Sequence, residues 1–372
     1  MWQADNSDIK DLIGLVGAKA IRQGADAASF MTDWRGRHEG RALGVAMPAS
    51  AEEAARIVRF CRDRKIPLYP QGGNTGLCAG GVPPAGRERC LVLSAARLRK
   101  VREIDAVGDV AVVESGVVLS ALHQKAEEAG RIFPLRLGAE GSAQIGGLIS
   151  TNAGGTGAVR YGVMRDLVMG LEAVLPDGRI IRRLGGLRKD NRGYDWKHLL
   201  IGGEGSLGFV TAAALKLFPA LRDAAHAGCV VADPQAAVEL FRRMRERFDT
   251  AIQAFELLSG GEAALALRHV GGLRAPFQPL PDWIVMIELG GTDPDGGLAL
   301  RLTKFLEGAL SQGLIADAII PADMKQVNDL WALRHSLSEA NKKEGHGIVF
   351  DVALRVSQVS SFIARATSLV ER

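Results

Sequence analysis

Short runs of apolar residues, separated by polar stretches with helical periodicity, dominate the first two hundred positions. The runs 43–47 and 66–69 predict strands. Between them, Ser50 precedes Glu53 by three positions, which is the spacing of a capping box and predicts a helix that continues through Arg64. The apolar positions on one face of this helix are Ala54, Ile57, Val58 and Cys61. The pattern therefore begins as a βα unit.

The same reasoning predicts the remaining elements. Up to Pro219 we expect strands at 90–93, 98–104, 110–114 and 170–175, and helices at 8–24, 119–129 and 196–201. Beyond it we expect strands at 226–231, 251–257, 283–289 and 348–354, and helices at 233–247, 297–311 and 322–343. The α+β alternation after Pro219, with few special turns, predicts a separate domain. The chain should thus divide into an N-terminal helical segment (1–33), a larger domain (34–219) and a second domain (220–372).

Composition and charge exclude several classes of protein. With 47% hydrophobic and 24% charged residues, the chain should be globular, and it contains no apolar run of the roughly 20 residues that a membrane span needs. The net charge of +4 is scattered without a basic run, which argues against nucleic acid as a partner. The start of the chain lacks a secretory signal pattern, and the four cysteines have no metal-ligand spacing, so we expect a cytoplasmic protein with reduced thiols.

The 45 glycines are the unusual feature of the composition, and many of them gather in three clusters at or near the ends of predicted strands. These clusters lie at 70–83, 138–155 and 202–211. Consecutive glycines let backbone N–H groups converge on an anion such as a diphosphate. A tight turn without a ligand is the alternative for any single cluster. The GxGxxG motif is missing after the first strand, so a Rossmann site is disfavoured, and the GxxxxGK[ST], HExxH and GxSxG motifs of other familiar sites do not occur in the sequence.

The motifs PQGGNTGLCAGGVP, GAEGSAQIGGLISTNAGG, RYG, LRKDNRGYD and GGEGSLGFVT follow one another in this order. In sequence and order they resemble FAD-linked dehydrogenases of the vanillyl-alcohol oxidase superfamily, in its D-2-hydroxyglutarate, D-lactate and glycolate dehydrogenase branch. The resemblance covers roughly residues 34 to 360. It implies an FAD-binding domain of two α+β subdomains over 34–219 and an α+β cap domain with an antiparallel sheet over 220–372.

The resemblance also assigns cofactor-binding residues. The FAD diphosphate would be held by Gly72, Gly73, Asn74, Thr75 and Gly76, flanked by Pro70 and Leu77. The flavin and ribityl path would be lined by Gly138, Ser142, Gly146, Asn152, Gly154 and Gly155, with Gly205 and Val210 near the adenine end. Some relatives attach the flavin through a histidine or a cysteine in the first two motifs. This chain has Asn74 at the first place and no cysteine from Gly138 to Gly155, so FAD should bind non-covalently.

In the second domain, the run NDLWALR that ends at Arg334 is similar to the helix from which this family presents an arginine to the substrate carboxylate. A planar guanidinium suits this task because it can make two charge-assisted bonds. An arginine on an amphipathic helix is otherwise usually a solvated surface residue. Ser338, one turn later, would help to orient the substrate. Val349 stands where D-2-hydroxyglutarate dehydrogenases carry a lysine, which favours a smaller or more apolar 2-hydroxy acid.

The family's histidine-rich metal motif, which implies zinc or a similar divalent metal and a general base, has no counterpart among the seven histidines. We therefore expect a chain without metal ligands, incomplete at its C-terminus. The implied function is oxidation of a D-2-hydroxy acid to the 2-keto acid by hydride transfer to flavin N5, with a quinone, cytochrome or electron-transfer flavoprotein as acceptor. The alternatives are a non-catalytic FAD-binding fragment or subunit, and an NADPH-dependent flavin reductase on the same fold. The oligomeric state stays open, a homo-oligomer included.

Overall fold

The computed structural model describes residues 6–371 and divides the chain into two compact units. The first unit comprises the described residues up to Gly155 together with Tyr161–Ala220, and the second comprises Thr156–Arg160 and the residues from Leu221 onward. Both units combine helices with sheets, which confirms the predicted α+β class. Among the described residues, no helix has the length and apolar character to cross a membrane.

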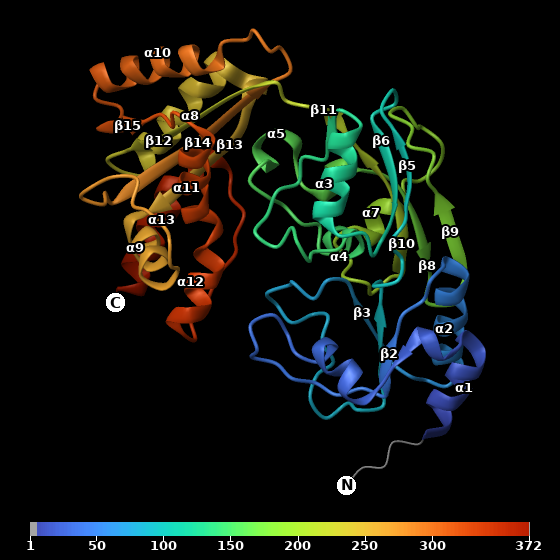
Figure 1. Ribbon diagram of the computed structural model, residues 1–372. Helices are drawn as coiled ribbons and strands as arrows, with labels where there is room; N and C mark the ends of the chain where they lie inside the picture. The colour runs from blue at the N-terminus through green and yellow to red at the C-terminus, as the bar shows by residue number, and fades with distance from the viewer. Residues whose placement is uncertain (1–5, 372) are drawn as a thin grey trace. The chain divides into compact units, whose positions relative to one another are not determined.

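A four-stranded sheet with the order β1-β2-β4-β3 forms one half of the first unit (Figure 1). Its strands are β1 (Ile21–Arg22), β2 (Gly44–Ala46), β4 (Leu91–Ser94) and β3 (Leu68–Gln71), and all but β1 run parallel. Helix α2 (Ala51–Asp63) buries its apolar face in the core of this half. The Ser50 hydroxyl accepts a hydrogen bond from the Glu53 amide at 3.1 Å, which confirms the predicted start of the helix.

The predicted helix 8–24 is wrong beyond its first half. Helix α1 (Asn6–Val16) ends because Gly17 takes a φ of 83°, outside the right-handed helical region. The chain continues through the 3-10 turn η1 (Ala18–Ala20), strand β1 and a second 3-10 segment, η2 (Gly24–Phe30). The apolar residues that suggested a longer helix instead contribute a strand to the sheet.

The other half of the first unit is a five-stranded antiparallel sheet with the order β5-β6-β10-β8-β9 (Figure 1). Its strands are β5 (Val101–Asp105), β6 (Val110–Glu114), β10 (Phe209–Lys216), β8 (Val168–Val174) and β9 (Ile180–Arg183). Helices α3 (Leu119–Glu128), α4 (Ile145–Ser150) and α6 (Met164–Leu167) share a buried apolar core with this sheet. Shorter elements of this half are α7 (Lys197–Leu200) and the pair β7 (Arg131–Ile132) and β11 (Phe218–Pro219). The short helix α5 (Ala158–Tyr161) lies mostly in the Thr156–Arg160 segment that belongs to the second unit. Strand β10 lies at the centre of this sheet although it is the last of the five strands in the sequence.

The second unit is built on an antiparallel sheet with the order β13-β14-β12-β15, as predicted for a cap domain. Its strands are β13 (Ile252–Ser259), β14 (Trp283–Gly291), β12 (Asp223–Val230) and β15 (Asp317–Ile319). Helices α8 (Pro234–Phe248) and α10 (Leu298–Ser311) share one apolar core with the sheet, together with the turn η3 (Asp249–Ala251). Helices α9 (Gly260–His269), α11 (Met324–His335) and α12 (Leu337–Glu344) share a second core, on the opposite face.

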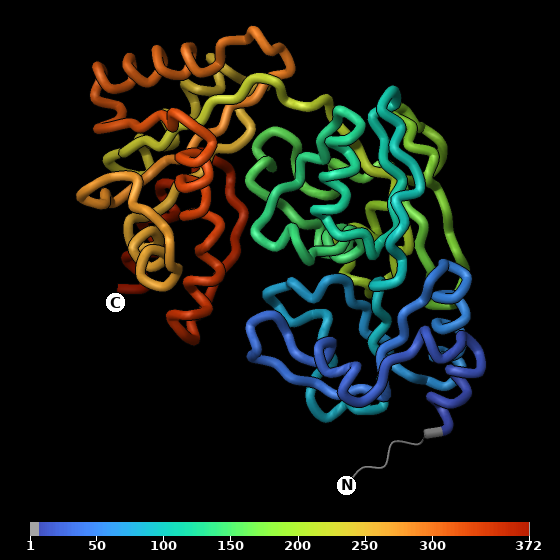
Figure 2. Tube along the Cα trace, in the orientation of Figure 1, coloured from blue at the N-terminus to red at the C-terminus, as the bar shows by residue number. Residues whose placement is uncertain are grey.

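Two predictions in the second unit need correction. The helix expected at 322–343 is interrupted at Ser336, whose ψ of −9° departs from the helical value, and forms α11 and α12. The strand expected at 348–354 is absent: residues 346–355 are irregular and appear as an uncoiled part of the tube between α12 and α13 (Val359–Val370) (Figure 2). Alternating apolar residues make a strand only with a partner, and no described strand pairs with this segment. Ile348 and Phe350 are consequently 87% and 81% exposed.

Candidate functional site

The first glycine cluster follows β3 and is closed at its base by Gln71. The buried Gln71 amide donates to the carbonyl oxygens of Phe30 at 2.9 Å and Gly81 at 2.8 Å. Asn74, at the tip, has a φ of 54° and donates through Nδ2 to the carbonyl of Thr32 at 2.8 Å. Side-chain hydrogen bonds thus fix the loop at both places.

The second glycine cluster packs directly against the first. A Cβ added to Gly73 would stand 1.9 Å from the carbonyl oxygen of Ser142, and one added to Gly72 would stand 3.3 Å from the Cα of Gly147. A Cβ atom does not approach another heavy atom outside its own and adjacent residues this closely in folded proteins, so glycine is required at position 73 by its neighbour rather than by its own backbone angles. Two predicted cofactor loops, 70 residues apart in sequence, therefore meet backbone to backbone.

The third cluster joins the other two. Gly205 has a φ of +78°, and a Cβ there would lie 2.6 Å from the ring of Pro70. The amide of Glu204 donates to the carbonyl of Ser150 at 2.9 Å. Arg165 adds a further tie, because its backbone amide donates to the side chain of Asn152 at 2.9 Å while its guanidinium donates to the carbonyl of His198 at 2.9 Å. All three clusters thus converge within the first unit.

The predicted cofactor residues differ in their surroundings. Pro70, Gly72, Gly73, Ser142 and Gly205 lie at the convergence just described. Gly146 and Gly155 are also closely packed, since added Cβ atoms would stand 2.6 Å from the Cβ of Ser115 and 2.0 Å from the carbonyl oxygen of Arg136. The remaining predicted residues of the three clusters except Val210 are partly or fully exposed to solvent: Asn74, Thr75, Gly76, Leu77, Gly138, Asn152 and Gly154. Val210 is 4% exposed and packs into the apolar core, so its side chain contributes to folding.

Two polar atoms that the sequence did not single out lie beside this convergence. Ser115 is fully buried and Gln144 is 8% exposed, and the Ser115 hydroxyl and the Gln144 side-chain oxygen have no hydrogen-bond partner among the described residues. Gln144 Cβ lies 3.6 Å from the position that a Cβ of Gly72 would take, and Ser115 contacts Gly146. Buried polar atoms without a partner are rare and costly. A cofactor that offers hydroxyl and N–H groups, as FAD does, suits such a site.

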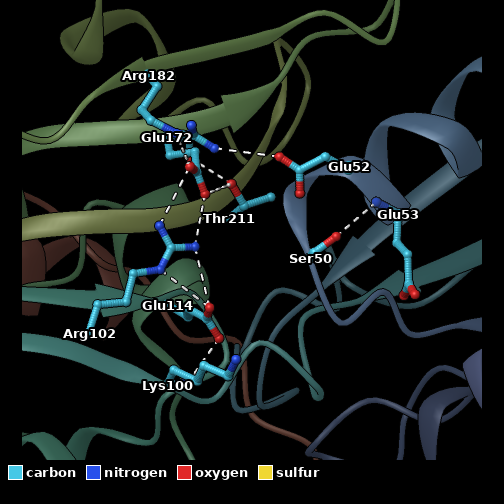
Figure 3. A network of polar contacts seen from close by, with 9 residues as sticks. All are labelled: Ser50, Glu52, Glu53, Lys100, Arg102, Glu114, Glu172, Arg182 and Thr211. Atoms are coloured by element: carbon cyan, nitrogen blue, oxygen red, sulfur yellow. Dashed lines mark hydrogen bonds and ion pairs between the residues drawn. The ribbon is translucent and has the colours of Figure 1, made fainter.

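A network of charged side chains lies on the strands of the five-stranded sheet (Figure 3). Glu172, on β8, is fully buried and accepts hydrogen bonds from Arg102 at 3.1 Å, from Thr211 at 2.9 Å and from Arg182. Arg102 also pairs with Glu114 on β6 at 3.3 Å. Each buried carboxylate is thus compensated by arginine, which is the condition under which buried charge is tolerated.

This network also reaches the other half of the first unit. Arg182 pairs with Glu52 at the start of α2, with 3.6 Å between Nη2 and Oε1 (Figure 3). Nearby, Arg59 of α2 donates to the carbonyl of Gly178 at 2.7 Å. Burial by itself would raise the pKa of Glu172, but the hydrogen bonds from Arg102, Arg182 and Thr211 outweigh it and hold that pKa below its ordinary value. Glu172 is therefore ionised at neutral pH and helps to hold the two sheets that carry the glycine clusters.

In the second unit, the predicted substrate residues lie on two different helices. Arg334 is in the last turn of α11, and its Nε donates to Oε2 of Glu256 on β13 at 2.6 Å. Ser338 is exposed on α12, beyond the interruption at Ser336, so the expectation that it follows Arg334 on one continuous helix is wrong. Glu256 was not predicted, because no local pattern connects it with an arginine 78 residues away.

The divalent metal that the resemblance implies does not fit the residues present. Among residues 6–371, no group of three or more His, Cys, Asp or Glu side chains comes together as metal ligands. His226 is a half-buried histidine whose Nδ1 accepts a hydrogen bond from Trp331 at 3.2 Å, and its partial burial lowers its pKa. No catalytic step is assigned to a metal on these residues.

Comparison with known proteins defines the class. Residues 42–183 match the FAD binding domain, and residues 221–372 match the C-terminal domain of FAD linked oxidases. The structure is similar to that of alkyldihydroxyacetonephosphate synthase, with a TM-score of 0.72 at 17% identity over 92% of this chain and 64% of that one. The fold is therefore the FAD-binding fold of the vanillyl-alcohol oxidase superfamily, as the sequence predicted.

Sequence comparison narrows the class to a family. The chain is 34% identical to mitochondrial D-2-hydroxyglutarate dehydrogenase of Arabidopsis thaliana, over 96% of this chain and 63% of that protein. It is 32% identical to D-2-hydroxyglutarate–pyruvate transhydrogenase of Saccharomyces cerevisiae, over 92% of this chain and 68% of that protein. The chain belongs to the family of FAD-linked oxidoreductases that contains these enzymes. It spans a little under two thirds of the length of the plant relative.

Proposed function

We propose that the protein is an FAD-dependent oxidoreductase that oxidises a D-2-hydroxy acid to the 2-keto acid. The observation that carries the proposal is the convergence of the three glycine clusters, with Gly73 against Ser142 and Gly205 against Pro70. Backbone that is kept free of side chains at three separate loops suits a long cofactor that must approach the main chain. The family relatives, which are D-2-hydroxyglutarate enzymes, support the choice of substrate class.

In this proposal each part of the chain has a defined task. The Gly72–Gly76 loop would offer backbone N–H groups to the FAD diphosphate, while Ser115 and Gln144 would bond to the polar groups of the cofactor. When bound, FAD supplies the acceptor for the substrate hydride. Arg334 would bind the substrate carboxylate through charge-assisted hydrogen bonds, and the exposed Ser338 hydroxyl would assist. Electrons would then pass to a separate acceptor such as a quinone, a cytochrome or an electron-transfer flavoprotein.

The test is an anaerobic absorbance spectrum of the purified chain loaded with FAD, recorded before and after adding D-lactate, D-2-hydroxyglutarate and their L-enantiomers. Loss of the flavin absorbance with a D-acid, and not with its L-enantiomer, is the expected result. A chain that binds FAD but is bleached by none of the acids would overturn the proposed oxidation and leave a flavin-binding module. Bleaching by NADPH alone would indicate the reductase alternative.

A further inference from the structure

Two side chains attach α11 to the sheet of the second unit. Trp331 donates through its indole N–H to Nδ1 of His226 on β12 at 3.2 Å, and Arg334 donates through Nε to Glu256 on β13 at 2.6 Å. Because residues three apart lie on the same face of a helix, both contacts point from α11 toward the sheet. The last turn of the helix, which carries Arg334, is therefore held at two strands.

The contact with Glu256 uses one edge of the Arg334 guanidinium. Among residues 6–371, this guanidinium makes one hydrogen bond, through Nε. The N–H groups of both terminal nitrogens are therefore available to another acceptor. The arginine side chain is 37% exposed and Glu256 is 21% exposed, so the pair is accessible on one side. His226 adds no positive charge here, because its Nδ1 is an acceptor and burial lowers its pKa.

We propose that Glu256 is a positioning residue that fixes the plane of the Arg334 guanidinium so that its two terminal nitrogens bind a substrate carboxylate side by side. The inference rests on the proposed function, in which Arg334 is the carboxylate anchor. A guanidinium is rigid and planar, so one bond at Nε sets the direction of the four remaining N–H bonds. A preorganised group loses less conformational freedom when it binds its ligand, which increases affinity.

Glu256 has two opposing effects on an anionic ligand. Its negative charge weakens the attraction between Arg334 and a carboxylate, whereas its hydrogen bond aligns the guanidinium. Replacement separates these effects. Glu256→Gln keeps an acceptor for Nε and removes the charge, so binding should stay within about threefold of the native value. Glu256→Ala removes both, and if alignment dominates, affinity should fall by about tenfold.

The experiment measures dissociation constants for pyruvate and 2-oxoglutarate on the FAD-loaded full chain by titration calorimetry. Arg334→Ala should abolish most of the affinity, Glu256→Ala should weaken it about tenfold, and Glu256→Gln should restore it. Glu239→Ala is the matched control, because Glu239 pairs with Arg242 and Arg243 on the surface of α8 in the same unit. This control removes the same charge and should leave the dissociation constants unchanged.

The outcomes separate the two ideas. If Arg334→Ala binds both keto acids like the native chain, Arg334 is not the anchor and the role of Glu256 is overturned with it. If Arg334→Ala weakens binding while Glu256→Ala leaves it unchanged or tightens it, the anchor stands and the positioning role is wrong. Should Glu256→Ala fail to fold, Glu256→Asp replaces it: this variant keeps the charge but shortens the reach to Nε, and native affinity in it would equally overturn the inference.

Discussion

Gly73 and Ser142 lie so close that the carbonyl oxygen of Ser142 occupies the place where any other residue at position 73 would carry its Cβ. The contact joins the four-stranded sheet, through the loop after β3, to the five-stranded sheet, through the loop before α4. It thus belongs both to the fold of the first unit and to the proposed cofactor site.

From this contact we predict that Gly73→Ala destabilises the chain by about 2–3 kcal/mol, because the added methyl group must displace a backbone carbonyl. Gly76→Ala is the matched variant, since nothing lies within 4 Å of a Cβ at that position in the same loop. Urea unfolding of the two variants without added FAD would measure the difference. Equal stability of both would contradict the backbone contact.

Glu172→Gln should destabilise the chain by about 3 kcal/mol, because it removes the buried negative charge that Arg102 and Arg182 share and leaves Arg102 with Glu114 alone as a carboxylate partner among the described residues. Glu52→Gln serves as the control: its carboxylate is 62% exposed and touches Arg182 at 3.6 Å, so its loss should cost about 0.5 kcal/mol or less. Chemical denaturation at pH 7 gives both values. Similar losses in the two variants would show that burial of Glu172 has no special importance.

The same residue predicts a pH dependence. Because the pKa of Glu172 is lower in the folded chain than in the unfolded one, its stabilisation is complete above the unfolded pKa of roughly 4.3 and is lost as the pH falls through the folded pKa. The stability difference between the native chain and Glu172→Gln should therefore be constant from pH 7 to about pH 5 and shrink below about pH 4. Unfolding curves across this range would test it, and a difference that persists unchanged to pH 3 would refute it.

Thiol reactivity offers a further test. Cys61, Cys90 and Cys229 are buried, and burial raises the pKa of the Cys61 and Cys229 thiols to about 12 and that of Cys90 to about 11. Cys78 is exposed in the first glycine loop. A disulfide reagent such as DTNB should therefore label one thiol rapidly in the native chain, and Cys78→Ser should remove that phase. Bound FAD should slow the reaction; two rapid thiols would contradict the described burial.

Local signals in the sequence were sufficient for much of this architecture. The spacing of Ser50 and Glu53 predicted the start of α2, because capping depends on residues that are near in sequence. The glycine clusters predicted loops with little side-chain cover, but they did not indicate that these loops pack against one another. The pairing of Arg334 with Glu256, and the unpartnered atoms of Ser115 and Gln144, arise only when distant segments pack together. No periodicity or motif in the sequence indicates this pair or these unpartnered atoms.

The prediction of a strand at 348–354 was wrong for a related reason. Ile348, Phe350 and Val352 alternate with other residues as apolar residues do in a strand. This pattern describes one segment by itself, whereas a stable β-strand needs a second segment with which to form hydrogen bonds. The prediction of one continuous helix at 322–343 was wrong because the helical spacing of apolar residues continues on both sides of the interruption at Ser336. Patterns of burial do not report a change in backbone angle at a single residue.

The position of β10 at the centre of the five-stranded sheet has a consequence for biosynthesis. Its neighbours β6 and β8 emerge from the ribosome well before it, yet neither has its inner edge paired until β10 arrives. The third glycine cluster runs into the first residues of β10. The long loop that must close before these contacts form makes this step slow compared with the local helices. The three glycine clusters of the proposed cofactor site therefore come together among the last events in the folding of the first unit, and a nascent chain that ends before about Lys216 exposes two open strand edges.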